Sequence, residues 1–314
     1  MTVIGVDVGG TKVAAAVVDR GQPGEIATVP TDTSSRDALL EQLVSVVDGL
    51  RDDTVTAVGL GVPSIVDSRT GRIRYSVNVP LIDLPLRDLL TDRIGLPVFV
   101  ENDANCAALA EAYDGEELVA TDLVMFTVGT GVGGGLVLGG KLYRGATGAT
   151  AEMGHQLIGA DLRDELPEAG KFPQTGSLES FAAGGALEHL AERLARELPE
   201  SRLGQILAEN GRVTGRDAVT AAREGDAAGR RALRLLGQRL GVGIANAINV
   251  FDPAEVVIGG GVSAAGDLLL GPAREVAAQY TLTGVGTETT IRLARRGGEA
   301  GIVGAALVAV LEAE

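Results

Sequence analysis

The chain opens with two short apolar runs separated by a glycine turn. Residues 3–8 (VIGVDV) and 13–18 (VAAAVV) flank this turn at residues 9–12, a pattern that predicts a β-hairpin. The pattern returns later: residues 123–128 predict a strand, a glycine loop follows, and residues 135–138 predict the returning strand. The repetition indicates two α/β domains of similar plan, and we expect a cleft between them.

The rest of the chain alternates between helical and strand spacing. Leu39, Leu43 and Val47 are spaced as on one face of a helix, which predicts a helix over 36–50. Residues 160–175 are polar and irregular and predict a surface loop. Further strands are expected at 55–62, 97–101 and 255–258, and further helices at 103–113, 176–197, 214–223, 226–250 and 300–313.

A length of 314 residues is ample for two domains. We expect an N-terminal α/β domain over residues 1–118, completed by the C-terminal helix 300–314. The second α/β domain is expected over residues 119–299.

Composition narrows the function classes. The formal charge of -15 disfavours a nucleic-acid partner, because such binding relies on neutralising phosphates with Lys and Arg. There is no run of about 18 apolar residues and no basic segment before the first apolar run, so we expect neither a membrane span nor a signal peptide. Cys106 is the single cysteine and cannot form an internal disulfide, which favours a cytoplasmic protein.

Glycine is the unusual component. The chain has 45 glycines in 314 residues, roughly double the usual ~7%. They cluster at 9–10, 129–140 and 259–261, and these clusters are where we expect function.

The first cluster lies in Asp7-Val8-Gly9-Gly10-Thr11-Lys12. Glycines let the backbone approach a phosphate and present amide N–H groups to it. Asp7, at a strand end, could hold Mg²⁺ directly or through water. A plain hairpin turn explains this segment equally well when it is taken alone.

The second cluster, residues 129–135, contains the spacing G-x-G-x-x-G from Gly129 to Gly134. A dinucleotide-binding fingerprint needs a helix directly after the glycines and an acidic residue about 20 positions on at a strand end. Here the glycines lead into a predicted strand, and Glu152 lies in a loop-like segment. The dinucleotide site is therefore disfavoured, as is a Walker A loop, which would continue into Gly-Lys-[Ser/Thr].

Two further segments follow predicted strands. Asn102 and Asp103 lie between a strand and a helix, where Asp103 could act on a ligand or simply cap the helix. The third glycine cluster, Gly259-Gly260-Gly261, joins a strand to a helix start. That geometry suits packing against a flat base, although a tight strand–helix turn is an alternative.

The order and spacing of these segments carry a stronger signal than any one of them. The chain resembles the ROK (repressor, ORF, kinase) family, and within it the bacterial ROK glucokinases, from Ile4 to about Val310. The segments that carry the resemblance are DVGGTK at 7–12, ENDANCAALAE at 101–111, GTGVGGG at 129–135, EMGH at 152–155, GSLES at 176–180 and VIGGGVS at 257–263.

The resemblance implies the two-domain actin-like ATPase (ribonuclease H-like) fold and an ATP- and Mg²⁺-dependent sugar kinase. It implies that Asp103 is the general base and that Asp7 meets Mg²⁺ through the phosphates. The sugar-binding residues it implies are Asn78, Asn102, Asp103, Glu152, His155 and Glu179. The nucleotide-binding residues it implies are Asp7, Gly9, Gly10, Thr11, Lys12, Gly129, Thr130, Gly131, Gly133, Gly259, Gly260 and Gly261.

The implied chemistry suits these residues. Phosphoryl transfer is mostly positioning and charge stabilisation. A carboxylate in reach of the attacking hydroxyl aligns it and accepts its proton, an effect of roughly 10²–10⁴-fold.

The chain departs from the family pattern at the zinc site. After E-x-G-H the family has three cysteines that bind zinc with the histidine, and Gly170, Phe172 and Ser177 stand at those positions. A structural zinc normally has four ligands, so we expect no zinc. Phe172 and Leu178 could replace the metal by hydrophobic packing. A further departure, Ser64 after Pro63 where the family often has Gly, bears on sugar specificity.

Other functions stay open beside glucose phosphorylation. The acceptor could be fructose, N-acetylglucosamine, N-acetylmannosamine or a cyclitol, and polyphosphate could replace ATP as the donor. A sugar-sensing repressor would carry a DNA-binding helix-turn-helix before the kinase-like part, and here the phosphate loop begins at Asp7. A non-catalytic scaffold is disfavoured by the presence of Asp103. The family expectation for the assembly is a homodimer.

Overall fold

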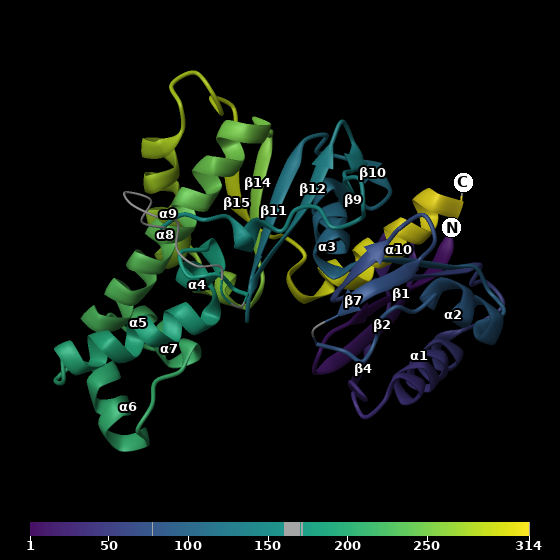
Figure 1. The fold of residues 1–314 in the computed structure, drawn as a ribbon, viewed down its shortest axis with the longest axis horizontal. Coiled ribbons are helices and arrows are strands. Elements are labelled where there is room, and N and C mark those ends of the chain that lie inside the picture. Colours follow the sequence, from purple (N-terminus) through teal and green to yellow (C-terminus); the bar gives the residue numbers. More distant parts are fainter. Residues whose placement is uncertain (77, 160–169, 171, 314) are drawn as a thin grey trace. The chain divides into compact units, whose positions relative to one another are not determined.

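The computed structural model describes residues 1–76, 78–159, 170 and 172–313, and Figure 1 traces its elements. Its contacts divide the chain into two compact units, described separately below. Unit 1 comprises Met1–Met125, Gly135–Ala151 and Arg295–Glu314, and unit 2 comprises Phe126–Gly134 and Glu152–Ala294. Unit 1 thus takes in residues 119–125, 135–151 and 295–299, which the sequence-based division places in the second domain. The expected loop at 160–175 lies mostly outside the described residues.

Unit 1 is built on a six-stranded sheet whose central strands are buried. The order is β3-β2-β1-β5-β8, with β4 also pairing with β2. β1 is antiparallel to β2 and parallel to β5, and β5 is parallel to β8. The strands are β1 (Thr2–Val8), β2 (Lys12–Asp19), β3 (Gln22–Pro23), β4 (Ala27–Pro30), β5 (Ala57–Val62) and β8 (Val98–Asn102).

Helices cover both faces of this sheet. The helices are α1 (Arg36–Leu50), α2 (Leu86–Ile94), α3 (Asp103–Ala112) and α10 (Ala300–Ala313). Because side chains alternate along a strand, Ile4, Val6 and Val8 share a core with α1 and α2. Val3 shares a second core with Ile302 of α10.

Glycines bring α10 directly onto the sheet. A Cβ on Gly59 would lie 1.7 Å from the Ala305 carbonyl oxygen, and one on Gly5 would lie 2.1 Å from that of Ile302. Strands β1 and β5 therefore need glycine where the last helix crosses them.

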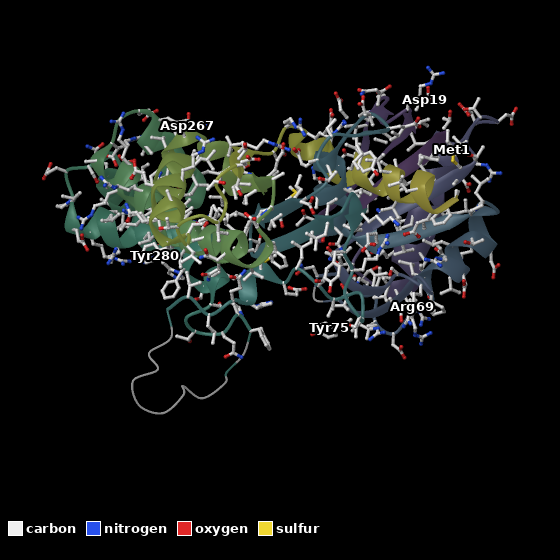
Figure 2. All side chains as sticks on the ribbon, turned by 90° about the horizontal axis from the view of Figure 1, so that it is seen from above. Met1, Asp19, Arg69, Tyr75, Asp267 and Tyr280 are labelled. Carbon is white, nitrogen blue, oxygen red and sulfur yellow. The ribbon has the colours of Figure 1, made fainter. Side chains whose placement is uncertain are left out.

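Two small hairpins decorate unit 1. They are β6 (Ser64–Asp67) with β7 (Arg72–Ser76), and β9 (Tyr113–Asp114) with β10 (Glu117–Leu118). Figure 2 shows Arg69 and Tyr75 at the surface of the first hairpin, where the Tyr75 side chain is exposed. Its strands pair with a bulge between Ile65 and Val66.

A second sheet has the strand order β13-β12-β11-β14-β15. The boundary between the two units runs through its strands β11 and β12. The strands are β11 (Leu123–Val128), β12 (Val132–Leu138), β13 (Lys141–Leu142), β14 (Glu255–Gly259) and β15 (Thr290–Leu293).

The helices of unit 2 gather around α8. Its backbone comes close to α9, because a Cβ on Gly237 would lie 2.3 Å from the Leu269 oxygen and one on Gly241 2.5 Å from the Ala273 oxygen. Figure 2 labels Asp267 and Tyr280 at the two ends of α9. The helices are α4 (Leu178–Ala182), α5 (Gly184–Glu197), α6 (Arg202–Asn210), α7 (Gly215–Arg223), α8 (Ala227–Phe251) and α9 (Asp267–Tyr280). Short 3₁₀ turns occur at Met153–His155, Gly261–Ala265 and Gly297–Glu299.

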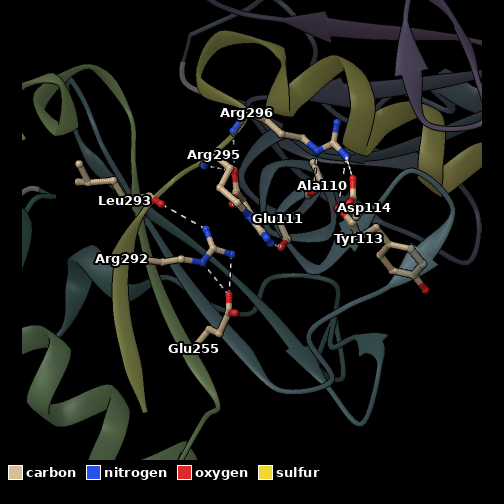
Figure 3. Close-up of polar contacts among 9 residues, drawn as sticks. All are labelled: Ala110, Glu111, Tyr113, Asp114, Glu255, Arg292, Leu293, Arg295 and Arg296. Atoms are coloured by element: carbon tan, nitrogen blue, oxygen red, sulfur yellow. Dashed lines mark hydrogen bonds and ion pairs between the residues drawn. The ribbon is translucent and has the colours of Figure 1, made fainter. Parts of the chain in front are cut away.

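Charged groups anchor the chain on each side of residue 294 (Figure 3). In unit 2, Arg292 of β15 pairs with Glu255 of β14 at 2.6 Å. In unit 1, the buried Glu111 carboxylate accepts the backbone N–H groups of Arg295 (2.8 Å) and Arg296 (3.0 Å). Glu111 thereby fixes the end of α3 to the segment that leads into α10.

Most expected elements are present, with instructive differences. The helix expected over 176–197 is interrupted at Ala183, whose backbone is extended and leaves Gly184 free to bond another loop. The strand expected from residue 135 begins at Val132, so it includes glycines. Among the described residues, no helix is long and apolar enough to cross a bilayer.

Candidate active site

The ends of parallel strands bring the expected residues of unit 1 to one edge of its sheet. Asp7 of β1 lies opposite Gly61 of β5, and Gly61 lies opposite Glu101 of β8. A Cβ on Gly61 would lie 3.7 Å from the Asp103 Cα. Carboxyl ends of parallel strands are where α/β folds bind ligands.

Asn102 and Asp103 occupy the turn from β8 into α3. Asn102 is the N-cap, and its Oδ1 accepts the N–H groups of Ala104 (3.0 Å) and Asn105 (3.1 Å). Asp103 is the first helical residue, and its Oδ1 also accepts the Ala104 N–H, at 2.8 Å. The capping role considered for Asp103 therefore falls mainly to its neighbour Asn102, and both side chains are half-buried.

A buried carboxylate supports this turn from below. Glu101 is 1% exposed, and its Oε1 accepts the Asn102 N–H at 2.8 Å and the Asn105 Nδ2 at 3.0 Å. Its Oε2 pairs with Arg144 Nε at 2.5 Å, and Arg144 also pairs with Glu312. Burial lowers the pKa of Arg144, but the two carboxylates together raise it above its ordinary value, so the guanidinium stays charged.

Sequence reasoning did not single out Glu101 or Arg144. Glu101 lies inside the ENDAN segment, but nothing in the neighbouring sequence distinguishes it from an ordinary strand residue. Its partner lies 43 positions further along the chain, and no local pattern links the two.

The first glycine turn joins β1 to β2 and is held from outside. Gly9 N–H donates to the Lys12 carbonyl at 2.8 Å. Thr31 fixes the turn twice: its hydroxyl donates to Gly9 O at 2.7 Å and its N–H to Thr11 O at 3.1 Å. A Cβ on Gly10 would lie 3.2 Å from the Asn78 Cβ. The structure thus places one expected sugar-binding residue against this turn.

Asp7 is the last residue but one of β1, and its side chain is half-buried. Burial raises its pKa above the ordinary value of 3.8, and the Lys12 ammonium only partly opposes this. Since the ionised form is disfavoured, a cation bound there would offset the burial of the charge. Asp7 is therefore a fitting position for the expected Mg²⁺.

The second glycine turn, in unit 2, leads directly into strand β12. Gly129 N–H donates to Gly131 O at 2.9 Å. The carbonyl of Gly129 accepts the Gly184 N–H at 2.8 Å, and the Val132 N–H donates to Glu179 Oε2 at 2.7 Å. Since no helix follows these glycines, the structure agrees with the rejection of a dinucleotide fingerprint. The exposed Thr130 lies at the tip of the turn.

Three expected sugar-binding residues lie beside this turn. Glu152 precedes a short 3₁₀ turn of which His155 is the last residue, and Glu152 Oε2 lies 3.6 Å from His155 Nε2. A Cβ on Gly154 would lie 2.2 Å from the Val132 carbonyl oxygen, so glycine is required between them. Glu179 lies in the first turn of α4, which Ser177 caps.

The third glycine cluster follows β14. Gly260 has φ 83°, and a Cβ there would lie 2.4 Å from the Val128 carbonyl oxygen. Both the conformation and the close approach require glycine. Gly260 and Gly261 are exposed, whereas Gly259 is buried in the strand end.

The residues present do not fit the zinc site implied by the family pattern. Gly170, Phe172 and Ser177 offer no thiolate, and in the described ranges no three His, Cys, Asp or Glu side chains converge on a metal position. Instead the Phe172 ring meets the His155 ring edge-on, with centroids 5.0 Å apart and planes at 75°. Leu178, the other residue considered for packing, is fully buried.

Comparison with known proteins gives a consistent result. The ROK family pattern matches residues 3–311. The chain is 35% identical to a glucokinase of Halalkalibacterium halodurans, over 96% of this chain and 92% of that protein. It is also 35% identical to a glucokinase of Streptomyces coelicolor, over 96% of each.

Solved structures agree. A ROK family glucokinase from Streptomyces griseus, in complex with glucose and AMPPNP, is 34% identical with a TM-score of 0.83, covering 99% of this chain and all of that one. The expected two-domain actin-like ATPase fold is thereby confirmed. With the family pattern matched over nearly its whole length, the chain belongs to the ROK family.

Proposed function

We propose that this protein is an ATP-dependent sugar kinase that converts glucose to glucose 6-phosphate. The observation that carries the proposal is the full-length similarity to glucokinases, one of them solved with glucose and AMPPNP.

Asp103 is the proposed general base. Its carboxylate accepts the proton of the attacking sugar hydroxyl while the oxygen displaces ADP from the γ-phosphorus. The bond from Asp103 Oδ1 to the Ala104 N–H fixes the carboxylate. Glu101 fixes the preceding backbone through the Asn102 N–H. The sugar is held by Asn78, Asn102, Glu152, His155 and Glu179.

The turns at 9–12 and 129–133 are the proposed phosphate-binding loops, and 259–261 is the proposed adenosine contact. Asp7 would hold Mg²⁺ through the phosphates. Such an ion neutralises charge on the transferring phosphoryl group.

The test is a sugar panel with ATP and Mg²⁺, read by ADP release. We expect glucose to give the highest kcat/KM, and Asp103→Asn to lower kcat by about 10²–10⁴-fold. Asp88→Asn, an exposed carboxylate in α2, is the matched control and should leave the rate unchanged. If no sugar stimulates ADP release, the kinase proposal fails; if Asp103→Asn keeps the full rate, the base assignment fails.

A second substrate class has specific support. The chain is 33% identical over 82% of its length to an N-acetyl-D-glucosamine kinase of Shigella flexneri. The panel therefore includes N-acetylglucosamine, N-acetylmannosamine and fructose, and also polyphosphate as an alternative donor. If the enzyme prefers an amino sugar, that sugar replaces glucose as the proposed substrate, and the proposed reaction class stays the same.

We also propose that the enzyme works without zinc, with Phe172 packed on His155 in place of the metal. Elemental analysis of protein purified without added metal should find no stoichiometric zinc. One zinc per chain would contradict this.

We further propose that the protein is cytoplasmic, forms a homodimer and does not bind nucleic acid. The charge of -15 supports the last point. Sedimentation tests whether the protein is a dimer. A filter-binding assay with DNA tests whether it binds nucleic acid.

A further inference from the structure

Glu179 contacts the second glycine turn although it is expected to bind the sugar. Its Oε2 accepts the Val132 N–H at 2.7 Å. The same oxygen would lie 2.3 Å from a Cβ on Gly131. The carboxylate therefore fills the space that the missing side chain of Gly131 leaves.

The turn is tied to the Glu179 segment at both of its ends. The Gly129 carbonyl accepts the Gly184 N–H at 2.8 Å where the turn begins, and Val132 is bonded to Glu179 where it ends. Glu179 itself is fixed in the first turn of α4, whose N-cap Ser177 is fully buried. The bond between Gly129 and Gly131 lies within the turn. The two bonds that tie the turn to another segment both come from residues 179–184.

We propose that Glu179 is a positioning residue for the turn at 129–132 and couples sugar binding to nucleotide affinity. The inference rests on the proposed function, in which this turn receives ATP phosphates and Glu179 meets the sugar. Oε2 of Glu179 accepts the hydrogen bond from the Val132 N–H. A sugar hydroxyl that binds the same carboxylate therefore changes the strength of this hydrogen bond and the stability of the turn. Coupling of this kind is reciprocal: bound nucleotide must change sugar affinity by the same factor.

The charge of Glu179 separates the two roles. Holding Val132 needs only a hydrogen-bond acceptor, which the side-chain carbonyl of Gln also provides. Because Gln keeps the acceptor, Glu179→Gln preserves the positioning role while changing the sugar contact. Gln also carries no negative charge that would repel phosphates. Glu179→Ala removes both.

The experiment uses the full chain and measures the Kd of Mg²⁺·AMPPNP by calorimetry, with and without glucose. Without glucose, we expect Glu179→Ala to bind about tenfold more weakly than wild type, as for a lost charge-assisted hydrogen bond. Glu179→Gln should bind at least as tightly as wild type. Both variants should raise the KM for glucose. Glu152→Ala, another expected sugar contact that is exposed and has no contact with Val132 among those described above, should raise only the KM for glucose.

Amide hydrogen exchange gives a readout independent of activity. Exchange at Val132 should be faster in Glu179→Ala and close to wild type in Glu179→Gln and Glu152→Ala. Equal nucleotide affinity and equal Val132 exchange in Glu179→Ala and wild type would overturn the inference. Failure of the wild type itself to bind AMPPNP would instead refute the proposed function.

Discussion

The two units hold their candidate binding residues by different means. In unit 1, Asn102 ends strand β8, Asp103 begins helix α3, and the turn is supported by Glu101, whose buried charge is paired with Arg144. In unit 2, the turn at 129–132 is supported by Glu179, which is itself an expected binding residue. The support in unit 1 is therefore separate from the ligand contacts, whereas in unit 2 the two coincide.

The difference has a consequence for mutation. Loss of Arg144 in unit 1 leaves the buried Glu101 charge unpaired and should be seen first as instability. Loss of the support in unit 2 changes the shape of an exposed turn and should be seen first as lost binding or rate. The first two predictions below test this contrast, and the other two concern the first glycine turn and Asp7; they run from the largest expected effect to the smallest.

Arg144→Met should lower the free energy of unfolding by about 3 kcal/mol, since it leaves the Glu101 carboxylate buried without its partner. Denaturant unfolding measures this. The control is Arg72→Met, which removes an exposed pair with Asp83 and should change stability by less than about 0.5 kcal/mol. Equal losses of unfolding free energy in the two variants would show that the buried Glu101 pair stabilises the fold no more than an exposed pair does.

Gly131→Ala should lower kcat/KM by about 10²-fold, because a methyl group displaces the Glu179 carboxylate and misplaces the turn. Its stability should stay near wild type, since the obstructing atom is the end of a flexible side chain. Gly185→Ala, where a Cβ meets nothing within 4 Å, is the control. A stability loss as large as that of Arg144→Met would contradict the contrast between the units.

Thr31→Val should raise the KM for ATP about fivefold, the equivalent of about 1 kcal/mol for one lost hydrogen bond to Gly9 O. Valine keeps the shape of threonine without its hydroxyl. The nearby Thr33 is exposed, and Thr33→Val should have no effect. An unchanged KM would mean that the first turn keeps its form without this bond.

Asp7→Asn should raise the Tm of the ligand-free protein near pH 7. Burial raises the pKa of Asp7 in the folded state, so the folded protein retains this proton at pH values where the unfolded chain has lost it. Folding stability then falls as pH rises from the ordinary pKa of 3.8 through the folded value. The Tm gain should therefore shrink towards pH 4. A Tm that falls at neutral pH would show that ionised Asp7 stabilises the fold.

The sequence predicted the strands and turns that carry the candidate residues better than the side chains that support them. The hairpin at Asp7 to Lys12 and the strand–helix turn at Asn102 follow from local patterns of apolar residues, glycines and capping groups. Glu101 with Arg144, and Glu179 with Val132, join residues 43 and 47 positions apart, and no period in the sequence reports such pairs. Helix α9 was not among the expected helices, and Pro272 lies inside it.

Helix α10 has a consequence for how the chain folds as it is made. Strands β1 and β5 need glycine where α10 lies on them, and a Cβ on Gly304 would lie 1.8 Å from the Cys106 carbonyl oxygen. Strand β1 is thus completed by a helix that begins nearly 300 residues further along the chain. Contacts of such sequence separation form late, so this face of the unit 1 sheet stays uncovered until α10 has been made. Truncation before residue 300 should yield a chain that aggregates rather than a smaller folded enzyme.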